Sequence, residues 1–487
     1  MRTIICLTCL CALTAQADEL PLVPQPKSVR STGGFFAAEP VMRTRDASLP
    51  KEGYRLSVSA AGVKVLAADA AGEFYADVTL RQLKGADGRV PGCEIEDAPA
   101  YAWRGALVDE SRHFFGEAAM KRVIDWMAYY KLNVFHWHLT DSPGWRIETE
   151  LYPELNRAGA TRPRPDYCKW LVDYEVGATP IEFYTKKQIR DIVKFAADRH
   201  VTVMPEIDFP GHSRAFNFAF PDLYCLGKRA FLHKLMWDDT HRHTEVVCLG
   251  NDKVVEMCEN LIKEVADVFP CEVIHIGGDE CVTNTWGQCA KCQKRIRNEK
   301  LGNEIGLQRW FIRRLAAAAA TKGKRVAGWD EMMAADPPKT AIMQNWHEQA
   351  LGVKAASAGF DVIMSPNLET YLDYNQGIAD DPHTYPGFSN AVVPWWRILA
   401  FDPMKGVDPK YRSRVLGGEA CNWTNCTPTE EELLWKMWPR QAAFAEAVWT
   451  DSPKPFPSSF ACRVKPHLER MRAAGVPVAP LISGPDR

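Results

Sequence analysis

The stretch Val273-Ile274-His275-Ile276-Gly277-Gly278-Asp279-Glu280 joins a short apolar run to two glycines and two acids. Such a run is typical of a buried strand in a parallel sheet. Neighbouring residues on a regular strand point to opposite faces, whereas glycine lets the backbone bend away from strand geometry. We therefore predict a buried strand that ends at the glycines. We expect Asp279 and Glu280 to reach one pocket beyond it.

Seven further apolar runs of similar length lie before and after this one, and amphipathic segments fill most of the gaps. Eight strands that alternate with helices predict an α/β fold, a (β/α)8 TIM barrel. The other seven runs are Arg104–Val108, Asn133–Leu139, Val201–Phe209, Arg325–Trp329, Ala341–Trp346, Val362–Met364 and Val415–Ala420.

Two segments precede the barrel, which we assign to residues 99–487. Residues 1–17 carry one charge, an apolar run and the small-residue pattern Ala15-Gln16-Ala17, which predicts a cleaved signal peptide and a secreted or periplasmic protein. Residues 18–98 alternate short strand patterns with Gly and Pro and contain one helical stretch, Ala70–Leu83. We expect them to form a small α+β domain.

Charge and hydropathy each argue against one class of partner. Lys and Arg number 59 against 61 Asp and Glu, so the chain has no basic footprint for nucleic acid. No stretch after the leader approaches the ~20 apolar residues of a membrane span. The oligomeric state is left open.

The carboxyl ends of barrel strands carry the chemistry in this fold. Here they bring together acids, histidines and the indoles of Trp329, Trp346 and Trp423. Aromatic rings can cover the apolar face of a sugar, and two carboxyls in different surroundings can divide acid and base roles. The sequence therefore favours a catalytic, sugar-binding pocket.

The motif HIGGDE at 275–280 resembles the signature of glycoside hydrolase family 20, the β-N-acetylhexosaminidases, in its bacterial type. The resemblance extends over nearly the whole mature chain, because supporting motifs follow in the family's order. These are WRGALVDESRHFF (103–115), KLNVFHWHLTDSPGWRIE (131–148), FYTKKQIRDIV (183–193), MPEIDFPGH (204–212), GWDE (328–331), YLDY (371–374) and GGEACNW (417–423).

The resemblance implies three catalytic residues. Glu280 would be the general acid and base, and Asp279 would orient and stabilise the 2-acetamido group of the substrate. The carbonyl oxygen of that group replaces an enzyme nucleophile. Tyr371 would hydrogen-bond the attacking acetamide. The other implied substrate-binding positions are Arg104 and Asp373 for hydroxyls, Trp329, Trp346 and Trp423 for the walls, and Asp208, His212 and His275, with Asp141, around Glu280.

The implied activity is an exo-acting, retaining β-N-acetylhexosaminidase that removes terminal non-reducing β-linked GlcNAc or GalNAc through an oxazolinium intermediate. The implied partner is a glycan, and no cofactor is expected. Asn425 stands where the family commonly has Glu. The choice between GlcNAc and GalNAc, the natural glycan and its linkage are therefore left open.

Twelve cysteines follow the leader, and an even number in an exported protein favours disulfides. Cys225 and Cys248 bracket a loop and could form a pair. Cys281, Cys289 and Cys292 could serve as structural or disulfide cysteines. Alternatively they could be part of a zinc site, which would need a further thiolate or imidazole.

Two other functions compete with glycoside hydrolysis. His136 and His138 share one face of a strand, as in metal-dependent amidohydrolases, which would make the chain an amino-sugar deacetylase. The chain could instead be a non-catalytic glycan-binding protein on a hydrolase scaffold. The intact pair Asp279-Glu280 argues against this second alternative.

Overall fold

The computed structural model describes residues 20–160, 181–231, 245–379, 381–383, 391–451 and 454–484. The predicted signal peptide, residues 1–17, lies outside the described residues.

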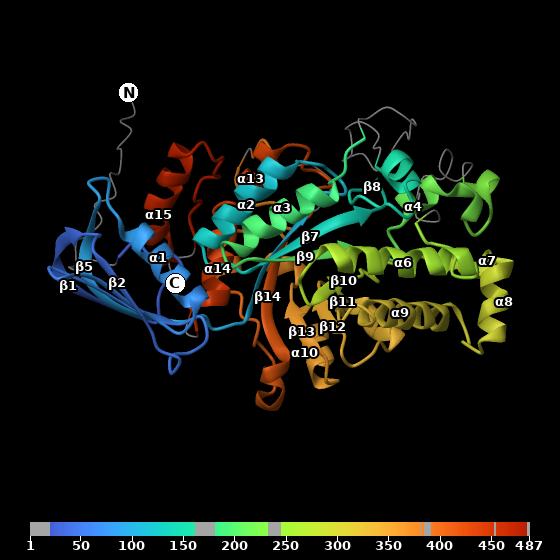
Figure 1. Ribbon diagram of the computed structural model, residues 1–487, viewed down its shortest axis with the longest axis horizontal. Coiled ribbons are helices and arrows are strands. Elements are labelled where there is room, and N and C mark those ends of the chain that lie inside the picture. The colour runs from blue at the N-terminus through green and yellow to red at the C-terminus, as the bar shows by residue number, and fades with distance from the viewer. Residues whose placement is uncertain are drawn as a thin grey trace, which may run out of the picture.

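A closed barrel of eight parallel strands forms the larger part of the molecule (Figure 1). β14 pairs with β6 and β6 pairs with β7, which closes the sheet. The predicted (β/α)8 barrel is therefore confirmed, and each of the eight apolar runs overlaps one strand. These strands are β6 (Trp103–Asp109), β7 (Val134–Asp141), β9 (Thr202–Ile207), β10 (Val273–His275), β11 (Arg325–Trp329), β12 (Ile342–Asn345), β13 (Asp361–Met364) and β14 (Val415–Asn422).

Helices surround the barrel and bury their apolar faces against it. In α3 (Lys186–Ala197), the side chain of Thr185 accepts a hydrogen bond from the Gln188 N–H, and the Gln188 side chain accepts one from the Thr185 N–H. This reciprocal cap fixes where the helix begins. The other main helices are α2 (Glu117–Tyr129), α6 (Asp252–Val268), α9 (Glu304–Ala320), α10 (Gln349–Ser357), α13 (Glu430–Met437), α14 (Arg440–Trp449) and α15 (Pro457–Ala473).

Shorter elements lie in the connections, mainly at the carboxyl ends of the strands. β8 (Gly144–Trp145) pairs antiparallel with the end of β7. The short helices are η1 (Leu155–Gly159), α4 (Arg214–Ala219), η2 (Pro221–Leu223), α7 (Asn284–Gln288), α8 (Ala290–Asn298), η4 (Asp330–Ala335), α11 (Asn367–Thr370), α12 (Trp395–Leu399) and η5 (Pro409–Arg414).

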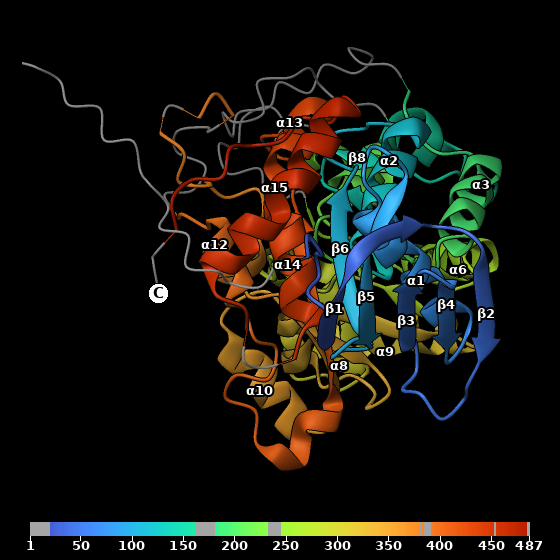
Figure 2. The same ribbon diagram turned by 90° about the vertical axis from the view of Figure 1, so that its left-hand side faces the viewer.

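The front domain is a five-stranded sheet covered on one face by α1 (Ala70–Leu83), the helix expected from the sequence (Figure 2). Its strand order is β1-β5-β3-β4-β2. Its strands are β1 (Ser28–Ala37), β2 (Val41–Arg45), β3 (Tyr54–Ser59), β4 (Gly62–Ala67) and β5 (Arg89–Asp97).

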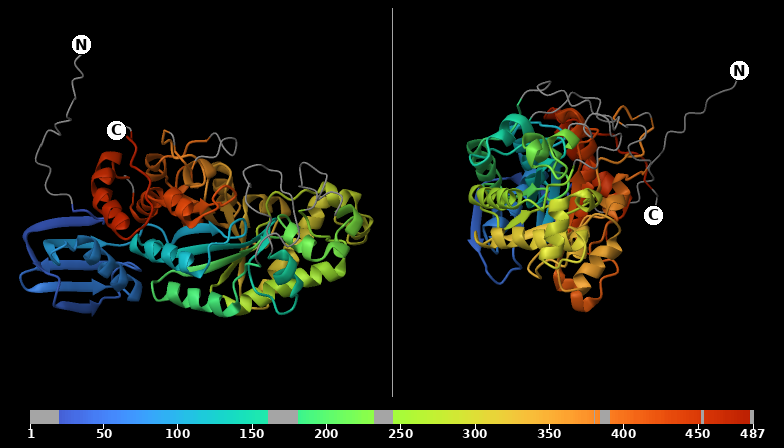
Figure 3. Two further views of the ribbon diagram at one scale, coloured as in Figure 1. Left: turned by 90° about the horizontal axis from the view of Figure 1, so that it is seen from above. Right: turned by 90° about the vertical axis from the view of Figure 1, so that its right-hand side faces the viewer.

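The front domain sits at the amino-terminal end of the barrel strands, away from α7 and α8 (Figures 1 and 3). Trp449 of α14 packs into the hydrophobic core of the front domain, and its indole N–H donates to Asp97 at 2.9 Å. The ammonium of Lys131 also lies 2.9 Å from Asp97. Buried polar contacts of this kind fix the two units to each other and leave the opposite end of the barrel for the pocket.

Within the described part of the chain, no helix is both long enough and apolar enough to cross a membrane.

Candidate active site

The turn after β10 carries both predicted catalytic acids into one pocket. Gly277 and Gly278 adopt φ values of 67° and 92°, so the chain leaves strand geometry directly after β10. A Cβ atom on Gly277 would lie 1.7 Å from a carboxylate oxygen of Asp208, so any other residue there would displace this carboxylate from its position. Asp279 and Glu280 both line the pocket beyond this turn. Their catalytic roles stay predictions.

The pocket opens at the carboxyl end of the barrel strands and has a volume of about 140 Å³. This is less than the roughly 300–1,000 Å³ of pockets for drug-sized ligands, which favours a single sugar ring over a longer chain. The lining residues come from the carboxyl ends of all eight barrel strands and from the loops that follow them. They are Arg112, Asp141, Asp208, His212, Asp279, Glu280, Trp329, Trp346, Tyr371, Trp423 and Asn425.

The two acids differ in their surroundings. The side chain of Asp279 is 14% exposed and that of Glu280 is 44% exposed, and each has a carboxylate oxygen 3.4 Å from Nε2 of His212. The other oxygen of Asp279, Oδ1, is buried and has no hydrogen-bond partner among the described residues. A buried carboxylate oxygen without a partner is costly, so this atom is suited to accept an N–H from a ligand.

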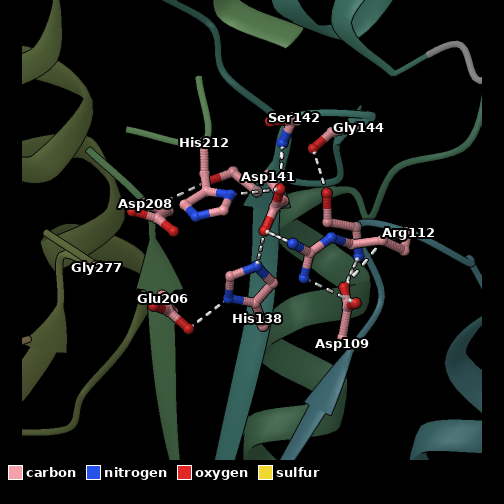
Figure 4. Close-up of polar contacts among 12 residues, drawn as sticks. Asp109, Arg112, His138, Asp141, Ser142, Gly144, Glu206, Asp208, His212 and Gly277 are labelled. Atoms are coloured by element: carbon pink, nitrogen blue, oxygen red, sulfur yellow. Dashed lines mark hydrogen bonds and ion pairs between the residues drawn. The ribbon is translucent and has the colours of Figure 1, made fainter. Parts of the chain in front are cut away.

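His212 belongs to a chain of charged groups that ends at Arg112 (Figure 4). Its Nδ1 lies 3.2 Å from Asp141, whose other oxygen lies 2.7 Å from the Arg112 guanidinium and 2.9 Å from Nε2 of His138. Burial opposes a charge on His212, but the carboxylates of Asp141, Asp279 and Asp208 outweigh it and raise the pKa of the imidazole well above its usual value. The ring is therefore a cation at neutral pH and faces both acids of the pocket.

Arg112 is the pocket arginine, and the prediction of Arg104 for this role is wrong. Arg104 lies near the amino-terminal end of β6 and is fully buried. Its guanidinium donates to Glu52 at 2.6 Å and to the Tyr101 carbonyl at 2.7 Å. It thus joins the barrel to the front domain. Arg112 follows the carboxyl end of β6, and Asp109 holds its guanidinium at 3.2 Å. Its position after a strand end is the signal that could have found it.

Four aromatic rings form the walls of the pocket. The centroid of Trp423 lies 5.7 Å from that of Trp329 and 6.1 Å from that of Tyr371, and Trp346 stacks on Tyr371 at 6.4 Å. The guanidinium of Arg112 lies 5.2 Å from the Trp423 ring centre. Burial raises the pKa of Tyr371 well above its usual value, so its phenol keeps the proton that it could donate.

Glu331 is an acid beside the pocket that belongs to the motif GWDE (328–331) but was not predicted as a site residue. Its carboxylate accepts the indole N–H of Trp346 at 3.0 Å, and the backbone N–H of Glu280 lies 3.5 Å from its other oxygen. Burial and the nearby charge of Asp279 raise the pKa of Glu331 to about 7. It is therefore an acid that changes charge near neutral pH, directly beside Asp279.

Three predicted residues lie at different depths around the acids. Asp208 lines the pocket beside the glycine turn, and burial together with Asp279 raises its pKa well above the usual value. His275 does not line the pocket: it is buried inside the barrel, where its Nδ1 lies 2.8 Å from Glu206. Asp373 is also buried outside the lining, and one of its oxygens has no partner among the described residues. Burial raises the pKa of Asp373 to about 7, although Lys436 and Arg440 oppose the shift.

His136 and His138 are bound to buried carboxylates beneath the pocket. Nδ1 of His136 lies 2.6 Å from Glu419, and its Nε2 lies 3.2 Å from Glu206. His138 bridges Glu206 and Asp141. Glu206 in turn accepts the indole N–H of Trp329 at 2.9 Å. This layer fixes the floor of the pocket and positions one of its walls.

A pocket with four carboxyl groups beside aromatic rings, at the carboxyl end of a (β/α)8 barrel, is suited to a carbohydrate substrate. Comparison with known families agrees. The catalytic domain of glycosyl hydrolase family 20 matches residues 101–452, and domain 2 of the same family matches residues 39–98. The chain belongs to glycosyl hydrolase family 20.

Relatives and solved structures support the same assignment. The chain is 37% identical over 445 residues to a beta-hexosaminidase of Porphyromonas gingivalis, covering 88% of this chain and 55% of the relative. It is 34% identical to a beta-hexosaminidase of Vibrio furnissii, covering 84% and 67%. The fold matches the crystal structure of an exo beta-N-acetylglucosaminidase from Vibrio harveyi with a TM-score of 0.84 and 26% identity, covering 95% and 79%. The chain thus spans about half the length of the Porphyromonas relative.

These matches decide between the alternatives drawn from the sequence. The catalytic domain of a glycoside hydrolase family matches most of the barrel, which argues against an amino-sugar deacetylase of the amidohydrolase type. The family and the named relatives are glycoside hydrolases, which also argues against a purely glycan-binding protein.

Proposed function

We propose that this protein is an exo-acting, retaining β-N-acetylhexosaminidase that removes terminal β-linked GlcNAc or GalNAc by substrate-assisted catalysis. The observation that carries the proposal is the buried, unpartnered Oδ1 of Asp279, which lies in the same small pocket as Glu280 and four aromatic rings. The names of the relatives from Porphyromonas and Vibrio support the same reaction class.

In this proposal the acetamido group of the substrate supplies the nucleophile. As its carbonyl oxygen attacks the anomeric carbon, positive charge develops on the amide nitrogen. An anionic Asp279 beside that nitrogen stabilises the transition state more than the ground state. The aromatic walls exclude water, so the interaction is less screened than in solvent. Tyr371 would donate its proton to the attacking oxygen and hold the amide in place.

Glu280 protonates the leaving oxygen in the first step and removes a proton from water in the second. Its side chain is the more exposed of the two acids, as a residue that meets both the leaving group and incoming water should be. Two successive inversions at the anomeric carbon give net retention. The cationic His212 contacts both acids and would restrain them in one arrangement during the two steps.

Arg112 and Asn425 are proposed to bind the hydroxyl groups of the sugar. The guanidinium lines the pocket and is held by Asp109 and Asp141, which fixes the orientation of its planar fork. Asn425 can both donate and accept hydrogen bonds but carries no charge. The proposal therefore includes both the gluco and galacto configurations of the terminal sugar.

Export to the periplasm or the medium is part of the proposal. It is supported by the leader pattern of residues 1–17 and by the disulfide formed by Cys426, since disulfides persist in oxidising compartments.

The test is a hydrolysis panel of 4-nitrophenyl β-glycosides of GlcNAc, GalNAc and glucose, followed by defined disaccharides. Proton NMR of the first product identifies the anomer, and an acetate assay detects deacetylation. A Glu280→Gln preparation, purified identically, controls for contaminating host glycosidases when natural disaccharides are used.

The proposal predicts release of β-configured GlcNAc or GalNAc from the non-reducing end, almost no hydrolysis of the glucoside, and no acetate. Rapid hydrolysis of the plain glucoside would contradict the role of the acetamide. An α-configured first product would contradict retention.

A further inference from the structure

Four cysteines gather in one cluster outside the pocket, and the proposed hydrolysis makes no use of them. Cys225 and Cys248 come from the segment between β9 and α6, and Cys289 and Cys292 lie at the start of α8. Their sulfur atoms all lie within 4.8 Å of one another. α8 stands at the end of the molecule opposite the front domain (Figure 1).

The spacing of these sulfurs fits a tetrahedral metal site. The Sγ atoms of Cys225 and Cys292 are 3.8 Å apart, those of Cys248 and Cys289 are 3.8 Å apart, and those of Cys248 and Cys292 are 4.0 Å apart. Four thiolates at ~2.3 Å from a central Zn²⁺ are separated by ~3.8 Å along each edge of the tetrahedron. The sulfurs are therefore already at the spacing that a single ion requires.

Disulfide pairing does not describe this cluster. Bonded sulfurs are ~2.05 Å apart, whereas all four thiols here are unbonded, including the Cys225 and Cys248 that the sequence suggested as a pair. The same structure does form a disulfide at Cys426. The four sulfurs thus lie within 4.8 Å of one another and form no bonded pair.

The surrounding backbone is arranged to support thiolates. The N–H of Gly250 donates to the sulfur of Cys292 at 3.2 Å, and a Cβ atom on Gly250 would lie 2.2 Å from the backbone nitrogen of Cys292. Only glycine allows this approach. Cys289 is the N-cap residue of α8 and Cys292 lies in its first turn, where the helix dipole favours negative charge.

The cluster is largely closed to solvent. Cys248, Cys289 and Cys292 are buried, and Cys225 is half-buried. Structural zinc sites have four protein ligands and no open position, whereas catalytic sites keep one position for water. Cys281 is not a member of the cluster: its sulfur contacts the carbonyl of Asp279 and the side chain of Gln308, so the expectation that it joins a zinc site is wrong.

We propose that Cys225, Cys248, Cys289 and Cys292 bind one structural Zn²⁺ as a tetrathiolate. The ion would tie the segment after β9, which carries His212, to the segment after β10, which carries Asp279 and Glu280. The two segments already meet, because the indole N–H of Trp286 donates to the Val247 carbonyl at 2.9 Å. The site therefore stabilises the two segments that form one side of the pocket.

Metal content of the purified full-length protein tests this proposal directly and without an activity assay. Protein expressed in zinc-containing medium and passed through a desalting column should contain about one Zn per chain by inductively coupled plasma mass spectrometry. A mercurial reagent that modifies thiols should release that zinc to a colorimetric indicator. Replacing Zn²⁺ with Co²⁺ should produce the thiolate charge-transfer absorption of a tetrahedral cobalt centre.

The double variant Cys289→Ser/Cys292→Ser should lose the zinc and unfold at a lower temperature. Cys462→Ser, at an exposed cysteine outside the cluster, is the matched control and should keep both the zinc and the Tm. If the double variant does not fold, mercurial titration of the unmodified protein still gives the answer.

Three results would overturn the proposal. One is metal-free protein that lacks the four thiols after denaturation, which would mean two disulfides. Another is metal-free protein with four reactive thiols. The third is iron in place of zinc. Each of these is independent of glycoside hydrolysis, so the proposed function and the zinc site fail separately.

Discussion

Replacing Asp279 by Asn isolates the negative charge that the proposed mechanism requires. Asn keeps the size of the side chain and one oxygen acceptor, but it removes the anion from the pocket. The developing charge on the amide nitrogen then loses its partner. The first chemical step should slow for every leaving group, because the lost interaction concerns the nucleophile and not the departing oxygen.

The size of the effect follows from the burial of the carboxylate. The Asp279 side chain is only 14% exposed, so an effective dielectric constant of ~20 is more suitable than that of water. Two unit charges at ~4 Å then interact by about 4 kcal/mol, which is close to a thousandfold in rate. Because the amide oxygen of Asn still accepts a hydrogen bond, we expect a loss of roughly 10²–10³ in kcat.

The assay is kcat/KM for a series of aryl N-acetyl-β-glucosaminides whose phenols differ in acidity. Asp279→Asn should lower all members by a similar factor, whereas Glu280→Gln should affect poor leaving groups most and activated ones least. Asp267→Asn, at an exposed surface carboxylate paired with Lys322, should equal the unmodified enzyme. Activity of Asp279→Asn within tenfold of the unmodified enzyme, or the same leaving-group dependence in both pocket variants, would refute these roles.

Three further predictions concern binding, pH dependence and stability. Arg112→Lys loses the planar guanidinium that Asp109 and Asp141 hold. Steady-state kinetics should show that kcat/KM falls by about tenfold to a hundredfold, mainly because KM rises. An unchanged KM would contradict hydroxyl binding by Arg112. Asp141→Asn removes a carboxylate that raises the pKa of His212, so the imidazole should lose its proton at lower pH. The alkaline limb of the kcat/KM profile should therefore shift to lower pH. A limb that stays at the same pH would show that His212 does not control it. The fold raises the pKa of Glu331 to about 7. Above this pH the charged carboxylate therefore destabilises the folded protein relative to the unfolded chain, in which the group ionises at its usual pKa. Glu331→Gln should therefore raise Tm at about pH 8, and thermal scans at falling pH should show the gain disappearing toward the usual pKa of 4.5; a gain that is independent of pH would exclude this explanation.

The barrel could be predicted because buried parallel strands leave a clear pattern. All eight apolar runs overlap strands, and the run that ends at Gly277 and Gly278 stops where the backbone turns. The double glycine also predicted that Asp279 and Glu280 share a pocket. Local backbone chemistry determines both features, so a single sequence contains them.

The family resemblance implied Arg104 as the arginine of the pocket, but the position of each arginine along β6 favours Arg112. Arg104 and Arg112 occur in the same motif but are eight positions apart, at opposite ends of β6. Arg104 near the start of β6 faces the front domain, whereas Arg112 follows the end of β6 at the pocket. The rule that chemistry lies at the carboxyl ends of barrel strands favours Arg112.

The membership of the cysteine cluster could not be derived from spacing. The CxxC spacing of Cys289 and Cys292 indicates two ligands of a metal site, but the other two members of the cluster, Cys225 and Cys248, come from the segment before α6. Only the adjacency of β9 and β10 in the barrel brings the two halves together. Cys281 is closer in sequence, yet the turn after β10 directs it toward Gln308.

The central claim is that the acetamide of the substrate is the nucleophile, and its most direct test is to weaken that nucleophile alone. The measurement is kcat/KM for aryl β-glucosaminides whose N-acetyl group carries zero, one, two or three fluorine atoms. Each fluorine withdraws electrons from the carbonyl oxygen, so the account predicts a steep, stepwise fall in kcat/KM across the series. Equal rates for all four substrates would contradict it, because an enzyme carboxylate would then be the attacking group.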